Sequence, residues 1–236
     1  MTEHLFREDA YARTCDAVVT VADADGIRLD RTVFYPMGGG QPGDIGVLLL
    51  ADGREVPIID TRKGAATNEI VHVPAEGSVL PAPGDSVRAE IDWDRRHRLM
   101  RMHSCMHLLC AVIEGDVTGG QIGEAKSRLD FNLPDTSLDK EHIGAELNRL
   151  IAEDHEIGTR WIGDDELDAN TDLVRTMSVQ PPRGQGQVRL LDIAGVDLQP
   201  CGGTHVKSTA EIGRVRVGKI ENKGRQNRRV NVLLDD

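Results

Sequence analysis

Aromatic residues are scarce in this sequence, at 3% of its 236 positions. Val, Ile, Leu and Ala must therefore fill the core, and the 39% of hydrophobic residues is enough for one large domain or two small ones. No stretch approaches the roughly 18–20 consecutive apolar residues that a membrane-spanning helix needs. The N-terminal stretch MTEHLFREDAYAR contains no apolar signal-peptide segment. These absences predict a soluble, cytoplasmic protein with no membrane partner.

Cysteine and positive charge are also in short supply. Four cysteines in a cytoplasmic protein favour free thiols or metal ligands over a disulfide framework. The 28 basic residues are outnumbered by 39 acidic ones, which gives a formal net charge of -11. Non-specific binding to nucleic acid depends on neutralising phosphates, so this balance argues against stable DNA binding.

The charge is unevenly distributed along the chain. Residues 135–172 contain twelve acidic and three basic side chains, whereas residues 207–229 contain eight basic and two acidic ones. A shorter basic run, RRHRLMR, covers residues 95–101. Two solvated faces would produce this pattern, and so would an acidic protein with one basic strip for the end of a nucleic acid. The composition leaves both interpretations open.

The first part of the chain has the pattern of β-structure. Apolar and polar residues alternate over 17–36 and again over 46–60, each time around an Asp-Gly pair typical of a hairpin turn. Two further short strands are predicted at 69–73 and 86–92, with a Pro- and Gly-rich loop between them. We therefore expect residues 1–92 to form a small β-barrel-like domain or a twisted antiparallel sheet.

The pattern changes at residue 92. Gly and Pro are absent from residues 92–114, and apolar residues there recur at helical spacing, which predicts an amphipathic helix. A glycine-containing turn, a strand at 125–133 and a second helix beginning near Ser137 are expected to follow. Strands are predicted at 159–163 and 187–193, on either side of a loop at 180–187, with a hairpin over 213–234. Residues 93–236 thus read as an α+β domain.

Two pairs of residues have the spacing of metal ligands. His103 and His107 are four positions apart in the predicted helix, so both imidazoles lie on one helix face. Cys201 and His205 have the same separation in the segment CGGTH. One histidine pair on a helix is more often a coincidence than a metal site. A thiolate and three imidazoles together make a tetrahedral zinc set, so the combined pattern favours bound Zn²⁺.

The remaining cysteines and histidines do not fit this pattern. A metalloprotease HExxH motif requires a Glu after the first His, and Ser104 occupies that position. Cys105 is rotated about 200° around the helix from His103, away from the metal face. We expect the cysteines other than Cys201 to be small buried residues and the other five histidines to be surface or locally bonded (Cys15, Cys105, Cys110; His4, His72, His97, His142, His155).

Three segments resemble a known family. FYPMGGGQPGD, RMHSCMHLL and DLQPCGGTHVKSTAEIGRVRVGKIENKGRQNRRV resemble, in the same order, motifs of alanyl-tRNA synthetase editing regions and of their free-standing relatives. The chain resembles the longer AlaX form of these editing proteins, and no aminoacylation domain is recognised in it. The resemblance implies an N-terminal β-domain followed by an editing domain like that shared by threonyl- and alanyl-tRNA synthetases. Ser104-Cys105 and Met37 depart from the family's usual Thr-Ala and acidic residue.

The resemblance implies hydrolysis of the ester between a wrong amino acid and the terminal adenosine of tRNA(Ala). An alanine pocket cannot reject the smaller glycine strongly, and it rejects the added hydroxyl of serine by only about 10²-fold. Zinc can polarise a carbonyl or activate water, but four protein ligands leave no open position. Three possibilities follow: one protein ligand leaves the metal, the coordination number rises above four, or the metal only shapes the pocket while other groups activate water. Under this reading the catalytic candidates are Gln41, His103 and His107.

The glycine-rich motif supplies the candidates for substrate binding. Gly38, Gly39 and Gly40 allow a ligand to approach the backbone closely, although a plain turn would use the same residues. The Gln41 amide can orient substrate or water. Thr32 shares a strand face with Phe34, and its hydroxyl is a candidate to bind that of serine. An ordinary β-branched strand residue is the alternative.

The C-terminal basic strip is the candidate for binding the acceptor end of mischarged tRNA(Ala). Its proposed phosphate contacts, which position the nucleic acid without reading its sequence, are Lys223, Arg225, Arg228 and Arg229. Two other functions remain open. The chain could hydrolyse a different small ester or amide on the same fold, or it could be a non-catalytic, zinc-stabilised RNA-binding module.

Overall fold

The computed structural model describes residues 2–133, 137–170, 173–174 and 186–235. The chain divides into two compact units, Met1–His97 (unit 1) and Arg98–Asp236 (unit 2), each with its own core. Within the described residues, no helix is long and apolar enough to cross a membrane. Most of the loop predicted at 180–187 lies outside the described residues.

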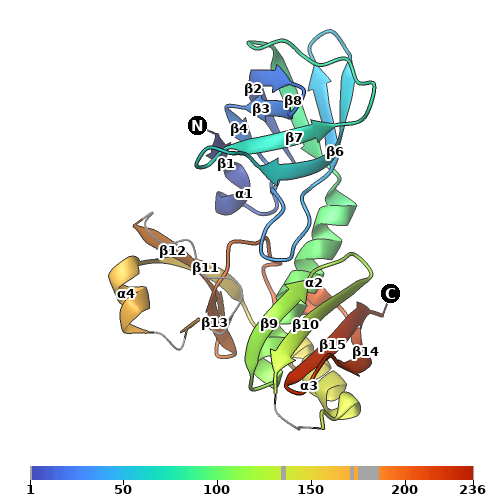
Figure 1. Cartoon of the computed structure of the whole chain (residues 1–236), viewed down its shortest axis with the longest axis vertical. Helices are drawn as coiled ribbons and strands as arrows, with labels where there is room; N and C mark the ends of the chain where they lie inside the picture. Colours follow the sequence, from blue (N-terminus) through green and yellow to red (C-terminus); the bar gives the residue numbers. More distant parts are fainter. Residues whose placement is uncertain (1, 134–136, 171–172, 175–185, 236) are drawn as a thin grey trace. The chain divides into compact units, whose positions relative to one another are not determined.

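The strands of unit 1 form a closed barrel, which is one of the two arrangements expected from the alternating pattern (Figure 1). Each strand turns one set of alternate residues inward, as in β6, where Val56 and Ile58 are buried and Glu55 is exposed. Aliphatic side chains dominate the core, as the shortage of aromatic residues requires. Going round the barrel, the strands are β2 (Thr14–Asp23), β3 (Gly26–Leu29), β7 (Ile70–Pro74), β6 (Glu55–Lys63), β5 (Gly46–Leu50) and β8 (Ser86–Ile91).

Two short elements within residues 3–8 were not predicted, and a third, at 31–32, lies within the β-structure predicted over 17–36. Strand β1 (Glu3–His4) pairs in parallel with β4 (Arg31–Thr32), and the one-turn helix α1 (Leu5–Glu8) follows β1 directly. They are too short for any periodicity to appear in the sequence. The pairing places Thr32 opposite His4, immediately before the segment that leads to the glycine-rich motif.

The helix predicted over 92–114 is α2 (Trp93–Val112), which runs from the end of unit 1 into unit 2. It is not amphipathic as expected, because every residue from Leu99 to Cys110 except Arg101 is buried. In unit 2, Asp139 caps the helix α3 (Lys140–Ala152) by accepting hydrogen bonds from the amides of Glu141 and His142. The helix therefore begins at Lys140 and not near Ser137, because the stronger capping geometry lies at Asp139.

A four-stranded antiparallel sheet accompanies α3 in unit 2 (Figure 1). The segment expected to be a glycine-containing turn includes strand β9, because the glycines let it lie close to β10. A β-carbon at Gly120 would come 2.9 Å from Leu129 Cδ2. The C-terminal hairpin is present as predicted. The sheet order is β14 (Val215–Asn222), β15 (Asn227–Leu234), β10 (Lys126–Asn132) and β9 (Asp116–Gln121).

A second, three-stranded sheet consists of β11 (Ile157–Gly163), β12 (Gln187–Ile193) and β13 (Asp197–Pro200). One face packs Ile162, Val188 and Leu190 against Leu167 of the short helix α4 (Asp164–Ala169). The sequence did not predict α4 or β13, each of which is too short to show a period. The mixture of separate sheets and helices confirms the α+β class. The chain then passes through a short 3₁₀ turn, η2 (Thr209–Ile212), into β14.

Candidate metal centre

Helix α2 supplies half of the candidate centre. His103 and His107 lie one turn apart, with ring centroids 5.6 Å from each other. Their residues are only 6% and 8% exposed. Because the rest of this helix face packs into the core, the two imidazoles are held where water reaches them poorly. This is the one-face arrangement that the spacing of four predicts.

The segment after β13 supplies the other half. Cys201 Sγ lies 3.1 Å from His205 Nε2 and 3.7 Å from His103 Nε2. One ligand atom from each of the four side chains can be chosen so that all lie within 4.8 Å of one another. The fold therefore brings together every residue predicted as a metal ligand, and all four belong to unit 2.

Neighbouring polar groups hold the imidazoles in position. Asp197 Oδ2 lies 3.2 Å from His107 Nδ1, which leaves Nε2 of that ring for the centre. Gln199 Nε2 donates to both carboxylate oxygens of Asp197, at 2.8 and 3.0 Å. Ser104 Oγ lies 3.2 Å from His205 Nδ1. Such partners fix the tautomer and ring orientation of metal-binding histidines.

The CGGTH segment is fixed through its backbone. Arg189 Nη1 donates to the carbonyl oxygens of Cys201 and Gly203, at 2.8 and 3.0 Å. The Gly203 amide also donates to Cys201 Sγ at 3.4 Å. Amide donors to sulfur favour its thiolate form. The backbone of the segment is thus hydrogen-bonded both to Arg189 of β12 and to the Cys201 sulfur.

The electrostatics of the cluster favour the thiolate form of Cys201. Burial would raise the pKa of Cys201, but the three neighbouring imidazoles outweigh it and lower that pKa well below its usual range. Burial lowers the pKa of His107, yet the Cys201 thiolate and Asp197 outweigh this effect and raise it to about 10. Burial and the nearby His103 lower the pKa of His205 to about 3, against the Cys201 thiolate, which raises it. A thiolate with three imidazoles is a donor set that fits zinc.

Sequence reasoning missed the supporting residues. The sequence identifies Ser104 as the position where a protease would have Glu and where the family usually has Thr, but it assigns Ser104 no role, and it does not single out Asp197, Gln199 or Arg189. One signal was available: Asp197, Gln199 and Cys201 alternate, so an extended segment puts all three on one face. Cys105 is buried, and burial raises its pKa to about 12, in keeping with an inert core thiol. Cys110 is buried too, whereas Cys15 is only partly buried.

The glycine-rich motif of unit 1 forms a tight turn. Gly38 and Gln41 pair through both backbone hydrogen bonds, at 3.0 and 2.9 Å. Gly39 and Gly40 between them have φ values of +57° and +83°, which other residues adopt only at a cost. These two glycines are exposed at the tip, whereas the Gln41 side chain is buried.

A buried ion pair in unit 1 holds the base of this turn. Arg96 Nε donates to both carboxylate oxygens of Asp44 at 3.0 Å, and Arg96 Nη2 also contacts that carboxylate. Asp44 in turn accepts from the Tyr35 amide at 2.6 Å. The Tyr35 hydroxyl donates to the Gly38 carbonyl at 2.9 Å. Neither Asp44 nor Arg96 was identified from the sequence, because partners 52 positions apart leave no local pattern.

The strand ends at Thr32, so Thr32 and Phe34 do not share a strand face as predicted. The Thr32 hydroxyl is engaged inside unit 1. It lies 2.8 Å from His72 Nε2 and accepts from the Phe34 amide at 3.0 Å. His72 Nδ1 donates to the Ile27 carbonyl at 3.0 Å, so Nε2 must accept the Thr32 proton. Both Thr32 and His72 have no exposed surface. The expectation of a surface or locally bonded histidine is therefore wrong for His72, whose partners lie 40 and 45 positions away in the sequence. A serine hydroxyl could therefore only donate to Thr32, through the remaining lone pair of its oxygen.

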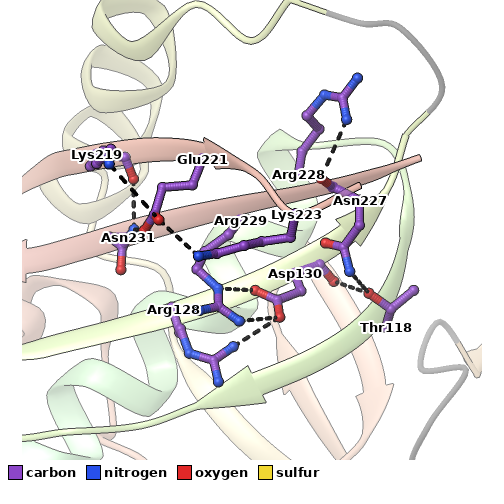
Figure 2. A network of polar contacts seen from close by, with 10 residues as sticks. All are labelled: Thr118, Arg128, Asp130, Lys219, Glu221, Lys223, Asn227, Arg228, Arg229 and Asn231. Carbon is purple, nitrogen blue, oxygen red and sulfur yellow. Dashed lines mark hydrogen bonds and ion pairs between the residues drawn. The ribbon is translucent and has the colours of Figure 1, made fainter. Parts of the chain in front are cut away.

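The four basic residues chosen from the C-terminal strip have different surroundings, and Figure 2 shows those of Lys223, Arg228 and Arg229. Arg229 forms a two-pronged ion pair with Asp130, at 2.8 Å for each contact. Lys223 Nζ lies 2.9 Å from Glu221 Oε2. Arg228 is 8% exposed and donates to the Gly224 carbonyl. Arg225 is exposed at the turn of the hairpin. Two of these four positive charges are thus balanced by carboxylates of the sheet.

Comparisons with known proteins identify the family. Residues 188–231 match the family model "Threonyl and Alanyl tRNA synthetase second additional domain", and residues 7–95 match "tRNA synthetases class II (A)". The chain is 38% identical to the alanyl-tRNA editing protein AlaX-M of Methanosarcina acetivorans over all of both chains. It is 33% identical to AlaX-M of Saccharolobus solfataricus over 98% of each chain. It is also 36% identical to the alanine–tRNA ligase of Metallosphaera sedula, covering 25% of that protein. The chain therefore belongs to the AlaX family of alanyl-tRNA editing proteins.

Proposed function

We propose that this chain hydrolyses the ester bond of mischarged tRNA(Ala), with Ser-tRNA(Ala) and Gly-tRNA(Ala) as its substrates. As a member of the alanyl-tRNA editing family it is an aminoacyl-tRNA deacylase. The observation that carries the proposal is the cluster of His103, His107, Cys201 and His205, in a chain similar over its whole length to alanyl-tRNA editing proteins. Hydrolysis of an ester needs no ATP, and we place this activity in the cytoplasm, in support of translation fidelity.

The four clustered side chains are proposed to hold Zn²⁺. When bound, zinc supplies a Lewis acid for polarising a carbonyl or for activating water. The chain's own contribution is orientation: Asp197 positions the His107 ring and Ser104 positions the His205 ring. Arg189 keeps the CGGTH backbone in place through two carbonyl oxygens. We retain His103 and His107 as catalytic candidates on this basis.

The glycine-rich turn is proposed to bind the aminoacyl end of the substrate. The backbone at Gly39 and Gly40 is exposed and has no β-carbon to hold a ligand away. Gly38 takes part through the turn that it closes with Gln41. The Gln41 amide is proposed to orient the ester or the attacking water, which requires local movement because its side chain is buried.

Thr32 is proposed to distinguish serine from glycine by accepting a hydrogen bond from the serine hydroxyl. Thr32→Val removes that acceptor and keeps the shape. It should slow Ser-tRNA(Ala) deacylation more than Gly-tRNA(Ala) deacylation, by a few-fold to about tenfold. Thr32→Ser keeps the hydroxyl and serves as the matched control. Gln41→Ala should slow both substrates alike. Equal losses for Thr32→Val on the two substrates would leave Thr32 with only its structural bonds to His72 and the Phe34 amide.

Side-by-side deacylation of Ser-tRNA(Ala), Gly-tRNA(Ala) and correctly charged Ala-tRNA(Ala) tests the proposed function. We expect rapid release of serine or glycine and slow release of alanine. His107→Ala should abolish release, whereas His142→Ala, an exposed histidine outside the cluster, should not. Binding of tRNA without turnover would identify a non-catalytic RNA-binding module. Turnover of small esters but not of aminoacyl-tRNA would identify a hydrolase of another class.

A further inference from the structure

One face of the three-stranded sheet connects the metal centre to an exposed tryptophan. Trp161 of β11 lies directly opposite Arg189 of β12. The Cys201 amide donates to the Arg189 carbonyl at 3.1 Å, which continues the β12–β13 register by one position. Residues directly opposite each other in a sheet project from the same face. Trp161, Arg189 and Cys201 therefore form one row across the sheet.

The two ends of this row differ in exposure. Leu191 and Ile193, which lie further along β12 on the same face, have no exposed surface, and Cys201 is partly buried. Trp161 at the other end is 48% exposed, and Thr159 beside it is exposed as well. Two strand spacings separate Trp161 from Cys201, so the row is about 10 Å long. This length is comparable to that of one nucleoside.

The charge on this face differs from that of the chain as a whole. The acidic residues of α4 belong to the helix that covers the opposite face, where Leu167 packs against Ile162. Among the paired residues of the three strands, the carboxylate on the Trp161 face is Asp197, whose side chain is 4% exposed and bonded to Gln199 and His107. Arg189 contributes a positive charge in the middle of the row. The face thus combines an exposed indole ring with a guanidinium group in a strongly acidic protein.

We propose that Trp161 is a stacking platform for an unpaired nucleobase at the 3′ end of the tRNA. This inference rests on the proposed function, since the ester to be hydrolysed sits on the terminal nucleoside. If the ester lies at the metal centre, the base of the same nucleoside or of its neighbour lies within reach of Trp161. Stacking on an aromatic ring tolerates any base, and a nearby Arg adds cation–π attraction. Arg189 is already fixed by two carbonyls, so it requires little ordering when the RNA binds.

A fluorescence titration tests this inference without requiring activity. The chain has two tryptophans, and Trp93→Phe leaves Trp161 as the reporter. Trp93 lies in unit 1, where its ring packs under the Arg13 guanidinium, 4.3 Å from the ring centroid. An uncharged tRNA(Ala) minihelix with its unpaired 3′ nucleotides should quench Trp161. A minihelix that lacks those nucleotides should not.

Substitution of Trp161 gives the second measurement. Trp161→Ala should weaken binding of the complete minihelix by about fivefold to 150-fold, the range for one stacked base. Trp161→Phe should retain most of the affinity. Both variants should bind the shortened minihelix as the parent chain does, and both should retain the parent zinc content. Equal affinity of Trp161→Ala and the parent chain for the complete minihelix would overturn the inference.

The two proposals can fail separately. A parent chain that deacylates Ser-tRNA(Ala), with a Trp161→Ala variant of unchanged KM, would disprove the stacking role and leave the proposed function standing. A parent chain that hydrolyses no aminoacyl-tRNA, yet loses minihelix affinity on Trp161→Ala, would leave an RNA-binding face without the proposed chemistry. Weaker binding of both minihelices by Trp161→Ala would identify a structural effect and contradict the inference.

Discussion

Units 1 and 2 both contain buried histidines, but the ring nitrogens of these histidines have different partners in the two units. His72 of unit 1 has a partner on each ring nitrogen, Thr32 on one side and the Ile27 carbonyl on the other. In unit 2, Asp197 and Ser104 engage one nitrogen each of His107 and His205, on the side away from the centre. The other sides converge on a thiolate. The comparison separates a histidine that completes a core from histidines that are positioned for a ligand. Burial alone does not distinguish them.

Removing the proposed zinc ion should have the largest effect, and this effect should be confined to unit 2. His107→Ala should reduce the zinc content from one ion per chain to nearly none, whereas His142→Ala should leave it unchanged. Without the ion, no metal–ligand bonds hold the clustered imidazoles and thiolate together, so unit 2 is less stable. Its amides should therefore lose protection against hydrogen exchange. Elemental analysis and hydrogen exchange check this. Unchanged zinc in His107→Ala would refute the ligand assignment.

Breaking the buried ion pair between Arg96 and Asp44 should have the opposite distribution of effects, because it should destabilise unit 1 and not unit 2. Arg96→Met leaves the Asp44 carboxylate buried without its cation, and it also removes donors from the Ala10 and Val33 carbonyls. The free energy of unfolding should fall by about 3–5 kcal/mol, measured by denaturant titration. Arg62→Met is the matched control, since Arg62 pairs with Asp60 at the surface and its loss should cost about 0–1 kcal/mol. Similar losses for both variants would show that burial does not set the strength of these pairs.

The His72 side chain should make unit 1 sensitive to acid. Burial lowers its pKa from 6.5 to about 4 in the folded chain, despite the Ile27 hydrogen bond. The unfolded chain therefore takes up a proton first as the pH falls, and stability that is complete above pH 6.5 is lost down to about pH 4. The loss amounts to about 3 kcal/mol.

His72→Gln isolates this contribution, because glutamine offers both an acceptor and a donor but does not titrate in this range. The carboxylates are common to both chains, so the difference between the two stability profiles reports His72. The parent should lose about 3 kcal/mol more than the variant between pH 6.5 and about 4. Parallel profiles would mean that His72 is not buried as a neutral ring.

The smallest expected effects concern the basic strip. Arg225 is exposed, whereas Arg229 is already paired with Asp130. Arg225→Ala should weaken tRNA binding and reduce the slope of log affinity against log salt by about 0.7–0.9, the contribution of one phosphate contact. Arg229→Ala should change that slope less. A larger slope change for Arg229 than for Arg225 would show that the tRNA displaces Asp130. Lys223 and Arg228 are expected to lie between the two.

The sequence predicted elements and ligands where a period or a fixed spacing exists. The alternation of 46–60 gave the β5–β6 hairpin, and the spacing of His103 and His107 gave their shared helix face. Contacts between distant positions had no such signal. Asp44 and Arg96, or Ser104 and His205, meet only because of the tertiary fold. Short elements such as α4 and β13 were missed for a related reason, since four to six residues are too few to show a pattern.

The spacing of the ligands also has a consequence for the order of folding. His103 and His107 need only one helix, but Cys201 lies 98 positions after His103. Closing a loop of that length costs about 4 kcal/mol of chain entropy, apart from a constant term. During synthesis on the ribosome, His103 and His107 alone should bind an ion only weakly, until the CGGTH segment has been synthesised. The proposed zinc ion should therefore bind late, when most of unit 2 has already folded. It should slow the unfolding of unit 2 more than it speeds its folding.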